Sequence, residues 1–173
     1  MAIEYRASEQ FCSAAKTEYE YELGRNANLD NKVSITLAFC GAVLLFLIDY
    51  LNIRSLWNFD AQIMCWECIL RFLCTIFQIG SLVCFGVCII RLFLILRPRT
   101  YLRVDTEFLL DETLPEWKPE QAHIYLGRRY SQFAANNNKI NEKRSQNYSY
   151  SVRWLLIAVL MCFFNEIIKF NFL

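Results

Sequence analysis

Residues 72–90, with the sequence FLCTIFQIGSLVCFGVCII, form a run of 19 residues without a charge between Arg71 and Arg91. A surface helix of a soluble protein keeps a polar face, whereas this run would be apolar on every face for about five turns. Because about 20 apolar residues cross the roughly 30 Å of bilayer hydrocarbon, the run predicts a transmembrane helix. The helical pattern extends over residues 61–96, and Pro98 supplies a stop because proline cannot continue a helix.

Two further apolar segments complete the predicted membrane region. Residues 33–53 begin with 16 uncharged positions. The last segment, residues 151–173, has a shorter apolar core followed by Glu166 and Lys169. It either crosses the bilayer, with these two side chains reaching for the far interface, or lies as an interfacial or buried helix. We therefore expect an all-α polytopic membrane protein with about two to three transmembrane helices, three being the leading expectation.

The composition of the whole chain narrows the classes of protein further. The chain has 173 residues, of which 55% are hydrophobic and 20% charged, with a net charge of +1. This composition excludes a disordered chain, and the balanced charge predicts no direct binding of nucleic acid. Most of the eight cysteines lie inside apolar runs, where we expect them to be buried as small hydrophobic residues. The opening residues, MAIEYRASEQ, lack the regions of a cleaved secretory signal.

The predicted segments follow one another as four regions. We expect an N-terminal cytoplasmic helix in residues 1–32, a transmembrane hairpin in 33–97, a cytoplasmic segment with an amphipathic helix in 98–150, and a C-terminal hydrophobic helix in 151–173. Basic residues set the orientation, because they are enriched on the cytoplasmic side of a membrane. The turn at 52–60 has one basic residue, Arg54, whereas the segment 98–150 has several basic residues near each of its ends. This difference places the N-terminus in the cytoplasm.

Within the cytoplasmic regions, residues 8–23 predict a helix that Gly24 ends. Residues 100–119 are irregular, with room for one short strand. Residues 120–150 are helical in pattern and continue into the last hydrophobic segment with little or no break. One face of this helix is predicted at steps of three and four residues: Tyr130, Phe133, Asn137, Ile140, Arg144 and Tyr148.

The chain offers little for catalysis. His123 is its one histidine, so no catalytic triad can be built beyond a single imidazole, and no glycine-rich phosphate loop occurs. Cys65 and Cys68 supply two of the four ligands that a zinc ion needs. We therefore expect no enzyme, no catalytic residue, no metal and no cofactor. A small transporter or redox subunit that uses this cysteine pair remains an open alternative.

Polar and charged positions in and beside the predicted spans are the candidate functional residues, because such groups line water or pair with one another in a membrane. Thr75, Gln78 and Ser81 follow one face of the second span, where they either pack against another helix or line a pore. An outer charge cluster is predicted from Asp49, Glu67, Arg71, Glu166 and Lys169. The cluster forms interfacial ion pairs in one protomer, or the mouth of a conduit in a ring of protomers.

The cytoplasmic helix carries basic residues that are candidates for docking a partner. They are Arg128, Arg129, Lys139, Lys143 and Arg144. The N-terminal region has an excess of acidic residues, so the two regions either dock on each other or present solvated charged faces.

Two stretches are similar to a known group of proteins. Residues 29–37, LDNKVSITL, resemble the D-x-K-A-S-x-L-L entry of SLATT and Pycsar-type bacterial membrane effectors, with Val33 in place of alanine. Residues 130–154 resemble the Asn/Lys-rich amphipathic helix that leads into the last hydrophobic segment of many such proteins.

The resemblance implies a small homo-oligomeric protein of the bacterial inner membrane that acts in antiphage defence. Such a protein permeabilises or depolarises the membrane when a partner, encoded nearby, senses infection. No nucleotide-sensor domain is recognisable in the chain, so the trigger is expected to come from a separate protein. The alternative is a membrane sensor or anchor that recruits and regulates a cytoplasmic defence partner.

Overall fold

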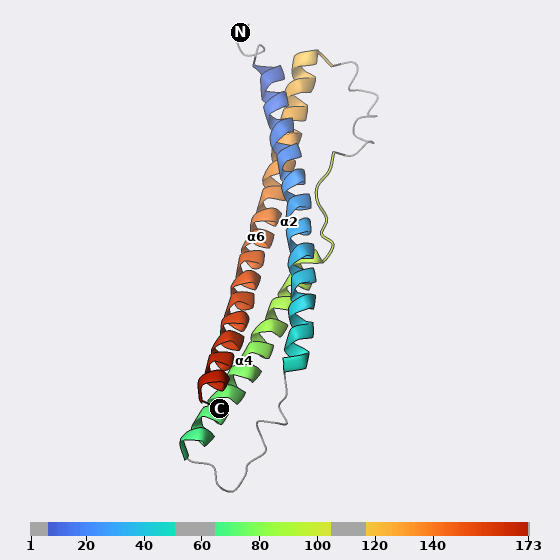
Figure 1. Cartoon of the computed structure of the whole chain (residues 1–173). Coiled ribbons are helices and arrows are strands. Elements are labelled where there is room, and N and C mark those ends of the chain that lie inside the picture. The colour runs from blue at the N-terminus through green and yellow to red at the C-terminus, as the bar shows by residue number, and fades with distance from the viewer. Residues whose placement is uncertain (1–6, 51–64, 105–116, 173) are drawn as a thin grey trace. The chain divides into compact units, whose positions relative to one another are not determined.

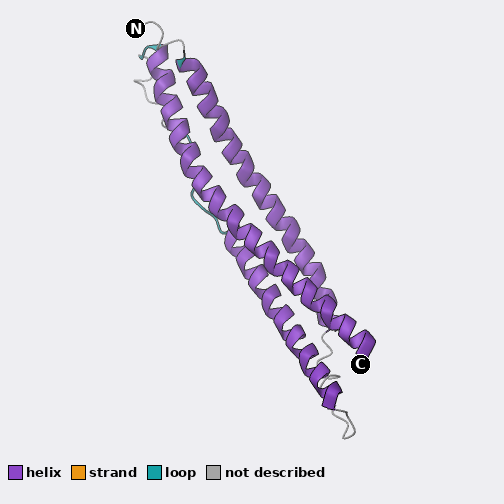
Figure 2. Cartoon of the chain, turned by 90° about the vertical axis from the view of Figure 1, so that its left-hand side faces the viewer, coloured by secondary structure: helices purple, strands orange, loops and turns teal. Residues whose placement is uncertain are grey.

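The computed structural model describes residues 7–50, 65–104 and 117–172, and most of them are helical (Figures 1 and 2). The helices are α2 (Ser8–Tyr50), α4 (Cys65–Leu96) and α6 (Pro119–Phe172), with lengths of 43, 32 and 54 residues. No strand occurs among the described residues. The expected all-α class is confirmed.

Helix α2 corrects one prediction, because it runs through Gly24 without a break. A glycine that ends a helix adopts a left-handed conformation, but no described glycine has a positive φ. A glycine inside a helix costs only about 1 kcal/mol relative to alanine. Packing along the rest of α2 offsets that cost, so the predicted short helix and the start of the first hydrophobic segment are one helix.

Helix α6 confirms that the amphipathic helix continues into the last hydrophobic segment. Helix α4 ends at Leu96, just before Pro98, as predicted. Its predicted first residues, 61–64, and residues 51–53 of the first hydrophobic segment lie outside the described residues. Residues 98–104 have no regular secondary structure, so the expected strand is absent from them. Residues 105–116 lie outside the described part.

Packing divides the chain into two units, which we call the first and second units. The first unit combines Met1–Asn31 with Pro98–Ser145, and the second combines Lys32–Arg97 with Gln146–Leu173. Helices α2 and α6 each contribute one part to each unit, whereas α4 belongs wholly to the second.

Most buried residues recur at steps of three, four or seven along each helix, which fits the repeat of coiled coils, whereas Cys84 is buried outside this pattern. In α2 they are Ala15, Tyr19, Glu22, Leu29, Val33 and Cys40; in α4 they are Cys74, Gln78, Ser81, Phe85, Cys88, Leu92 and Ile95; in α6 they are Ala134, Asn137, Asn141, Arg144, Ser151, Leu155, Ala158 and Asn165. We call these rows the seams. Apart from the C-terminal half of α4, which buries Phe85, Leu92 and Ile95, they are rich in small and polar residues.

In the first unit, α2 and α6 run parallel, as the pairing of Glu22 with Asn141 and of Tyr19 with Tyr130 shows (Figure 1). The two tyrosine rings lie 5.5 Å apart between centroids. The predicted face of α6 is correct at Asn137 and Arg144, which are buried. Half-buried neighbours occupy other predicted positions, since the seam follows a strict seven-residue repeat.

In the second unit, α4 runs antiparallel to α6 (Figure 1). A Cβ added at Gly80 would lie 3.1 Å from the sulfur of Met161. The core gathers residues of all three helices around Phe85, which is 1% exposed.

Candidate functional site

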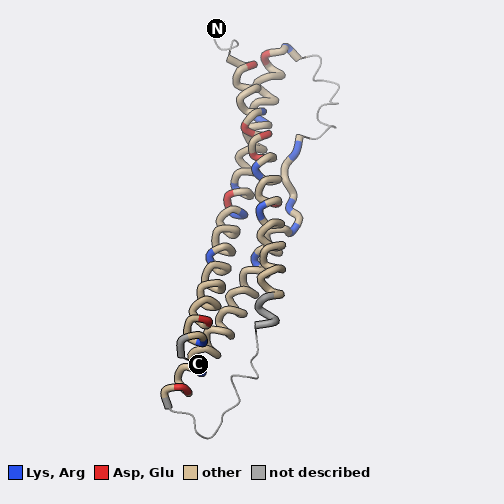
Figure 3. Tube along the Cα trace, in the orientation of Figure 1, with Lys and Arg blue, Asp and Glu red and all other residues tan. Residues whose placement is uncertain are grey.

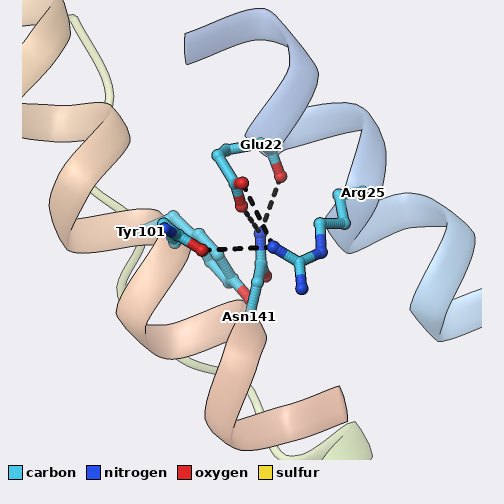
Figure 4. A network of polar contacts seen from close by, with 5 residues as sticks. Glu22, Arg25, Tyr101 and Asn141 are labelled. Carbon is cyan, nitrogen blue, oxygen red and sulfur yellow. Dashed lines mark hydrogen bonds and ion pairs between the residues drawn. The ribbon is translucent and has the colours of Figure 1, made fainter. Parts of the chain in front are cut away.

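A polar cluster lies in the seam of the first unit and is centred on Asn141 (Figure 4). The amide nitrogen of Asn141 donates to the Glu22 carboxylate and to the Glu22 backbone carbonyl, both at 2.8 Å. Its amide oxygen accepts a hydrogen bond from the Tyr101 hydroxyl at 2.8 Å. Arg25 forms an ion pair with Glu22 at 3.2 Å. The buried carboxylate, only 2% exposed, is therefore paired with a cation and an amide.

Arg144 extends this cluster one turn along α6. Its guanidinium donates to the Tyr101 hydroxyl at 2.9 Å and also binds Asn26 and Asp30. Burial alone lowers the pKa of Arg144, but the hydrogen bonds to Tyr101 and Asp30 outweigh it and raise the pKa overall. The guanidinium is therefore held in its charged form inside the unit.

This position corrects the prediction that Arg144 docks a partner. Its side chain is 4% exposed, and its two terminal nitrogens bind Asn26, Asp30 and Tyr101 within the chain, so little of it is accessible to another protein. Arg128, Lys139 and Lys143 are exposed, as a docking surface needs. Arg129 is half-buried, with its guanidinium over the ring of Tyr125 at 5.6 Å.

The segment 98–104, which we call the strap, lies along the first unit and is fixed by side chains. Asn137 donates to the backbone carbonyl of Leu102 at 3.1 Å and accepts from its backbone N–H at 3.2 Å. The Tyr19 hydroxyl accepts from the backbone N–H of Val104 at 3.4 Å. Because a backbone without secondary structure needs other partners when it packs on a protein, these side chains explain why the strap is ordered.

The second unit contains the predicted polar face of α4. Ser81 donates to the backbone carbonyl of Gln78 at 2.8 Å, and Thr75 donates to that of Arg71 at 2.9 Å, so both hydroxyls bind their own helix. Gln78 differs, because neither atom of its amide has a hydrogen-bond partner among the described residues. Its side chain is 6% exposed. A buried amide without partners costs about 1–3 kcal/mol, which marks Gln78 as the unusual member of this face.

Asn165 of α6 is a second unusual amide, and it was not among the predicted site residues. It is 2% exposed, and its amide oxygen has no partner within the described part of the chain. The antiparallel register, with Gly80 beside Met161, places Asn165 within about one turn of the level of Gln78. The seam of the second unit thus holds a layer of two buried amides whose hydrogen bonds are incomplete.

Two of the residues predicted to form the outer charge cluster pair with each other in the structure. Lys169 and Glu166 form an ion pair at 3.6 Å on α6, and Asn165 donates to Glu166 at 3.3 Å. Glu67 and Arg71 are half-buried on α4. The side chain of Asp49 lies outside the described residues.

Charged residues are sparse along α4 and along the last part of α6 (Figure 3). Two helical stretches, Trp66–Leu96 and Pro119–Phe170, are long and apolar enough to cross a membrane. Within the described ranges, no group of three or more His, Cys, Asp or Glu residues is arranged to hold a metal ion. Cys68 is a free thiol there, and the side chain of its predicted partner, Cys65, is outside the described set.

Comparison of the chain with protein-family models, with curated protein sequences and with solved structures gave no match.

Proposed function

We propose that the second unit is embedded in the bacterial inner membrane, and that copies of the chain assemble there into a homo-oligomer that permeabilises the membrane when a partner triggers it. The observation that carries the membrane proposal is the distribution of residues in the second unit. Small and polar residues fill much of the seam, and large apolar residues point outward.

The outward residues form broad apolar faces on α4 and α6. Only 33% of the most apolar 18 residues of α4, and 22% of those of α6, are buried. Exposed residues on these faces include Phe72, Ile76, Ile79, Val83, Phe93, Leu156, Leu160, Phe163 and Phe164. Soluble monomers rarely expose contiguous apolar patches of more than a few hundred Å². Lipid is the medium in which such faces are stable.

The seam supports the same medium, because helices in a bilayer approach closely through small residues. Cys74, Ser81, Cys88 and Ala158 occupy seam positions where a soluble coiled coil would place leucine or isoleucine. The described residues of the first hydrophobic segment also expose Phe39. The proposal therefore includes three spans, with the N-terminus in the cytoplasm as the basic residues predict.

The proposed conduit rests on the layer formed by Gln78 and Asn165. An amide without hydrogen-bond partners is more costly in a bilayer than at a surface, because no bulk water is present to satisfy it. In an oligomer, these two amides would bind water that crosses the membrane between helices. Among the described residues of one protomer, the Gln78 amide and the amide oxygen of Asn165 have no hydrogen-bond partner, while the Asn165 nitrogen donates to Glu166.

The test expresses the protein in bacteria and follows the membrane potential with a voltage-sensitive dye. We expect expression together with the trigger to depolarise cells, and Gln78→Leu or Asn165→Leu to abolish the effect at equal protein levels. Ile79→Leu is the matched control, because residue 79 is the exposed neighbour of Gln78. Depolarisation that both leucine variants retain would remove the conduit from the proposal. Extraction of the wild type from membranes by carbonate alone would overturn the membrane embedding.

The role in phage defence is supported by the resemblance of residues 29–37 and 130–154 to SLATT and Pycsar-type effectors. We expect cells carrying the gene with its native neighbours to reduce the plating efficiency of phage. Gln78→Leu should lose this protection in the same cells. Equal plating with and without the gene, over a broad phage panel, would refute the role.

A membrane sensor or anchor is the second candidate, favoured by the exposed basic residues Arg128, Lys139 and Lys143 on α6. Such a protein would bind an acidic cytoplasmic partner without conducting ions. Two results together would favour this candidate. One soluble protein should copurify with the chain at a fixed stoichiometry, and be lost when Arg128, Lys139 and Lys143 are all changed to Gln. Liposomes that contain the chain should remain impermeable to ions.

A further inference from the structure

A groove of about 310 Å³ lies on the second unit, with its wall on α4 and its end at α6. Val87, Ile90 and Leu94 form an apolar strip on α4, and Arg91 and Asn147 supply the polar end. The volume falls at the small end of the range for ligand pockets. The groove is therefore amphipathic, and its polar side chains lie together at one end.

The two polar side chains of the groove have hydrogen-bonding capacity to spare. Neither the Arg91 guanidinium nor the Asn147 amide makes a hydrogen bond or ion pair to another described residue. Asn147 contributes only its backbone carbonyl, which accepts from Ser151 at 2.9 Å. Arg91 is half-buried. A guanidinium is a planar donor that matches the oxygens of a phosphate.

The position of Arg91 in the chain indicates the depth of the groove. Arg91 ends the uncharged run 72–90 on the side that the positive-inside rule assigns to the cytoplasm. Basic pockets between membrane helices on this side bind anionic headgroups. The apolar strip formed by Val87 and Ile90 leads from Arg91 back toward the middle of the span.

We propose that this groove binds one anionic phospholipid, with its phosphate on Arg91 and Asn147 and the upper part of an acyl chain along Val87, Ile90 and Leu94. This inference rests on the proposed membrane embedding. A soluble phosphate compound would use only the polar end and leave the apolar strip without a partner. A zwitterionic lipid would place its own cation beside Arg91. Charge and shape together therefore select an anionic glycerophospholipid.

The experiment titrates the purified full-length protein, in detergent, with phosphatidylglycerol and counts bound lipids by native mass spectrometry. We expect one site to bind phosphatidylglycerol at least tenfold more tightly than phosphatidylcholine. Arg91→Gln should weaken this site by about tenfold to a hundredfold, because it removes charge-assisted hydrogen bonds. Inorganic phosphate at millimolar concentration should displace little of the lipid.

Arg97→Gln is the matched control, because it removes the same charge at the end of the same helix, outside the groove. General attraction of a basic residue to an anionic surface predicts a loss of about fivefold at most for this control. Leu94→Trp fills the groove without changing the charge and should also lower the affinity. Leu94 is 53% exposed, so the larger side chain does not disturb the core.

Equal losses for Arg91→Gln and Arg97→Gln, or equal binding of the two lipids, would overturn the proposed site. Displacement by inorganic phosphate together with indifference to Leu94→Trp would show a simple anion site instead, and would overturn it as well. These results would leave the membrane embedding intact as long as the protein still requires detergent for extraction. A wild-type protein that is monodisperse without detergent would remove the embedding itself.

Discussion

Replacement of Asn141 by alanine should loosen the first unit strongly. Asn141 is 1% exposed, and its amide joins Glu22 of α2 to Tyr101 of the strap. After truncation, the buried Glu22 carboxylate keeps Arg25 at 3.2 Å and loses its neutral donor. The Tyr101 hydroxyl keeps its bond from Arg144.

The expected cost follows from the three hydrogen bonds that Asn141 makes. A hydrogen bond to a charged group contributes about 1.5–3 kcal/mol, and each neutral one contributes about 1 kcal/mol. Because Glu22 and Tyr101 each keep one other partner, we expect a total loss of about 3 kcal/mol rather than the full sum. At about 1.4 kcal/mol for each factor of ten, the local unfolding equilibrium shifts by about a hundredfold.

Hydrogen exchange followed by mass spectrometry measures this shift in the detergent-solubilised protein. Amides of α2 around Glu22 should exchange about a hundredfold faster in Asn141→Ala. Asn138→Ala is the control, since Asn138 lies on the same helix, is exposed and accepts a single bond from Arg25 at 3.1 Å. We expect less than a fivefold effect there.

A double variant separates the polar pair from simple packing. Glu22→Leu combined with Asn141→Leu removes both buried partners, so neither is left unsatisfied, and it should recover most of the lost protection. The reasoning is wrong if Asn141→Ala exchanges like the wild type. It is also wrong if the double variant exchanges faster than Asn141→Ala alone.

Two further changes follow from contacts in the first unit. Asn137→Ala should release the strap, because the backbone N–H and carbonyl of Leu102 both lose their partner, and limited proteolysis should then cut there while α6 stays protected. Gly24→Ala should raise the free energy of unfolding by about 1 kcal/mol, as nothing lies within 4 Å of the added Cβ. Gly127→Ala should lower it, because its Cβ would come within 2.5 Å of the Phe11 ring; thermal melts of the two variants that shift in the same direction would contradict one of the two expectations.

The helices and apolar spans follow from the sequence because they depend on local properties. The run between Arg71 and Arg91 lacks charge over a bilayer's width, and α4 ends at Leu96, just before Pro98, as expected. The continuity of α6 follows from a helical pattern without a proline after Pro119. The prediction that Gly24 ends a helix was wrong because a glycine caps a helix only when its φ is positive. The sequence gives the residue type but not its φ.

The seams could not be found from hydrophobic periodicity, because much of what they bury is small or polar. The exposed residues around the seam of α4 are as apolar as the buried ones or more so. The buried residues include Cys74, Gln78, Ser81 and Cys88. The seven-residue spacing of these small and polar residues is the signal that the sequence does contain. The predicted face of α6 was instead chosen at steps of three and four residues, which gave the buried Asn137 and Arg144 and half-buried residues elsewhere on that face.

The candidate sites were predictable where a polar residue interrupts an apolar run. Gln78 was found in this way, since its surroundings make an amide conspicuous. That Gln78 and Asn165 lie at similar depth in the second unit depends on the antiparallel register of α4 and α6. A local sequence pattern does not contain this register. The same holds for the pairing of Glu22 with Asn141, because Asn141 lies on a different helix.

The polar residues of the first unit have a physical reason to occupy its seam. A seam of leucine would allow α6 to slide past α2 by one heptad at little cost. With the observed residues, the same slide would place Glu22 opposite Ala134 or Tyr148 and would leave a buried carboxylate without its amide donor. That loss costs several kcal/mol, so only one register satisfies Glu22 and Asn141 together. The cluster thus exchanges some stability for a single alignment of two long parallel helices, which an apolar seam of similar spacing would not specify.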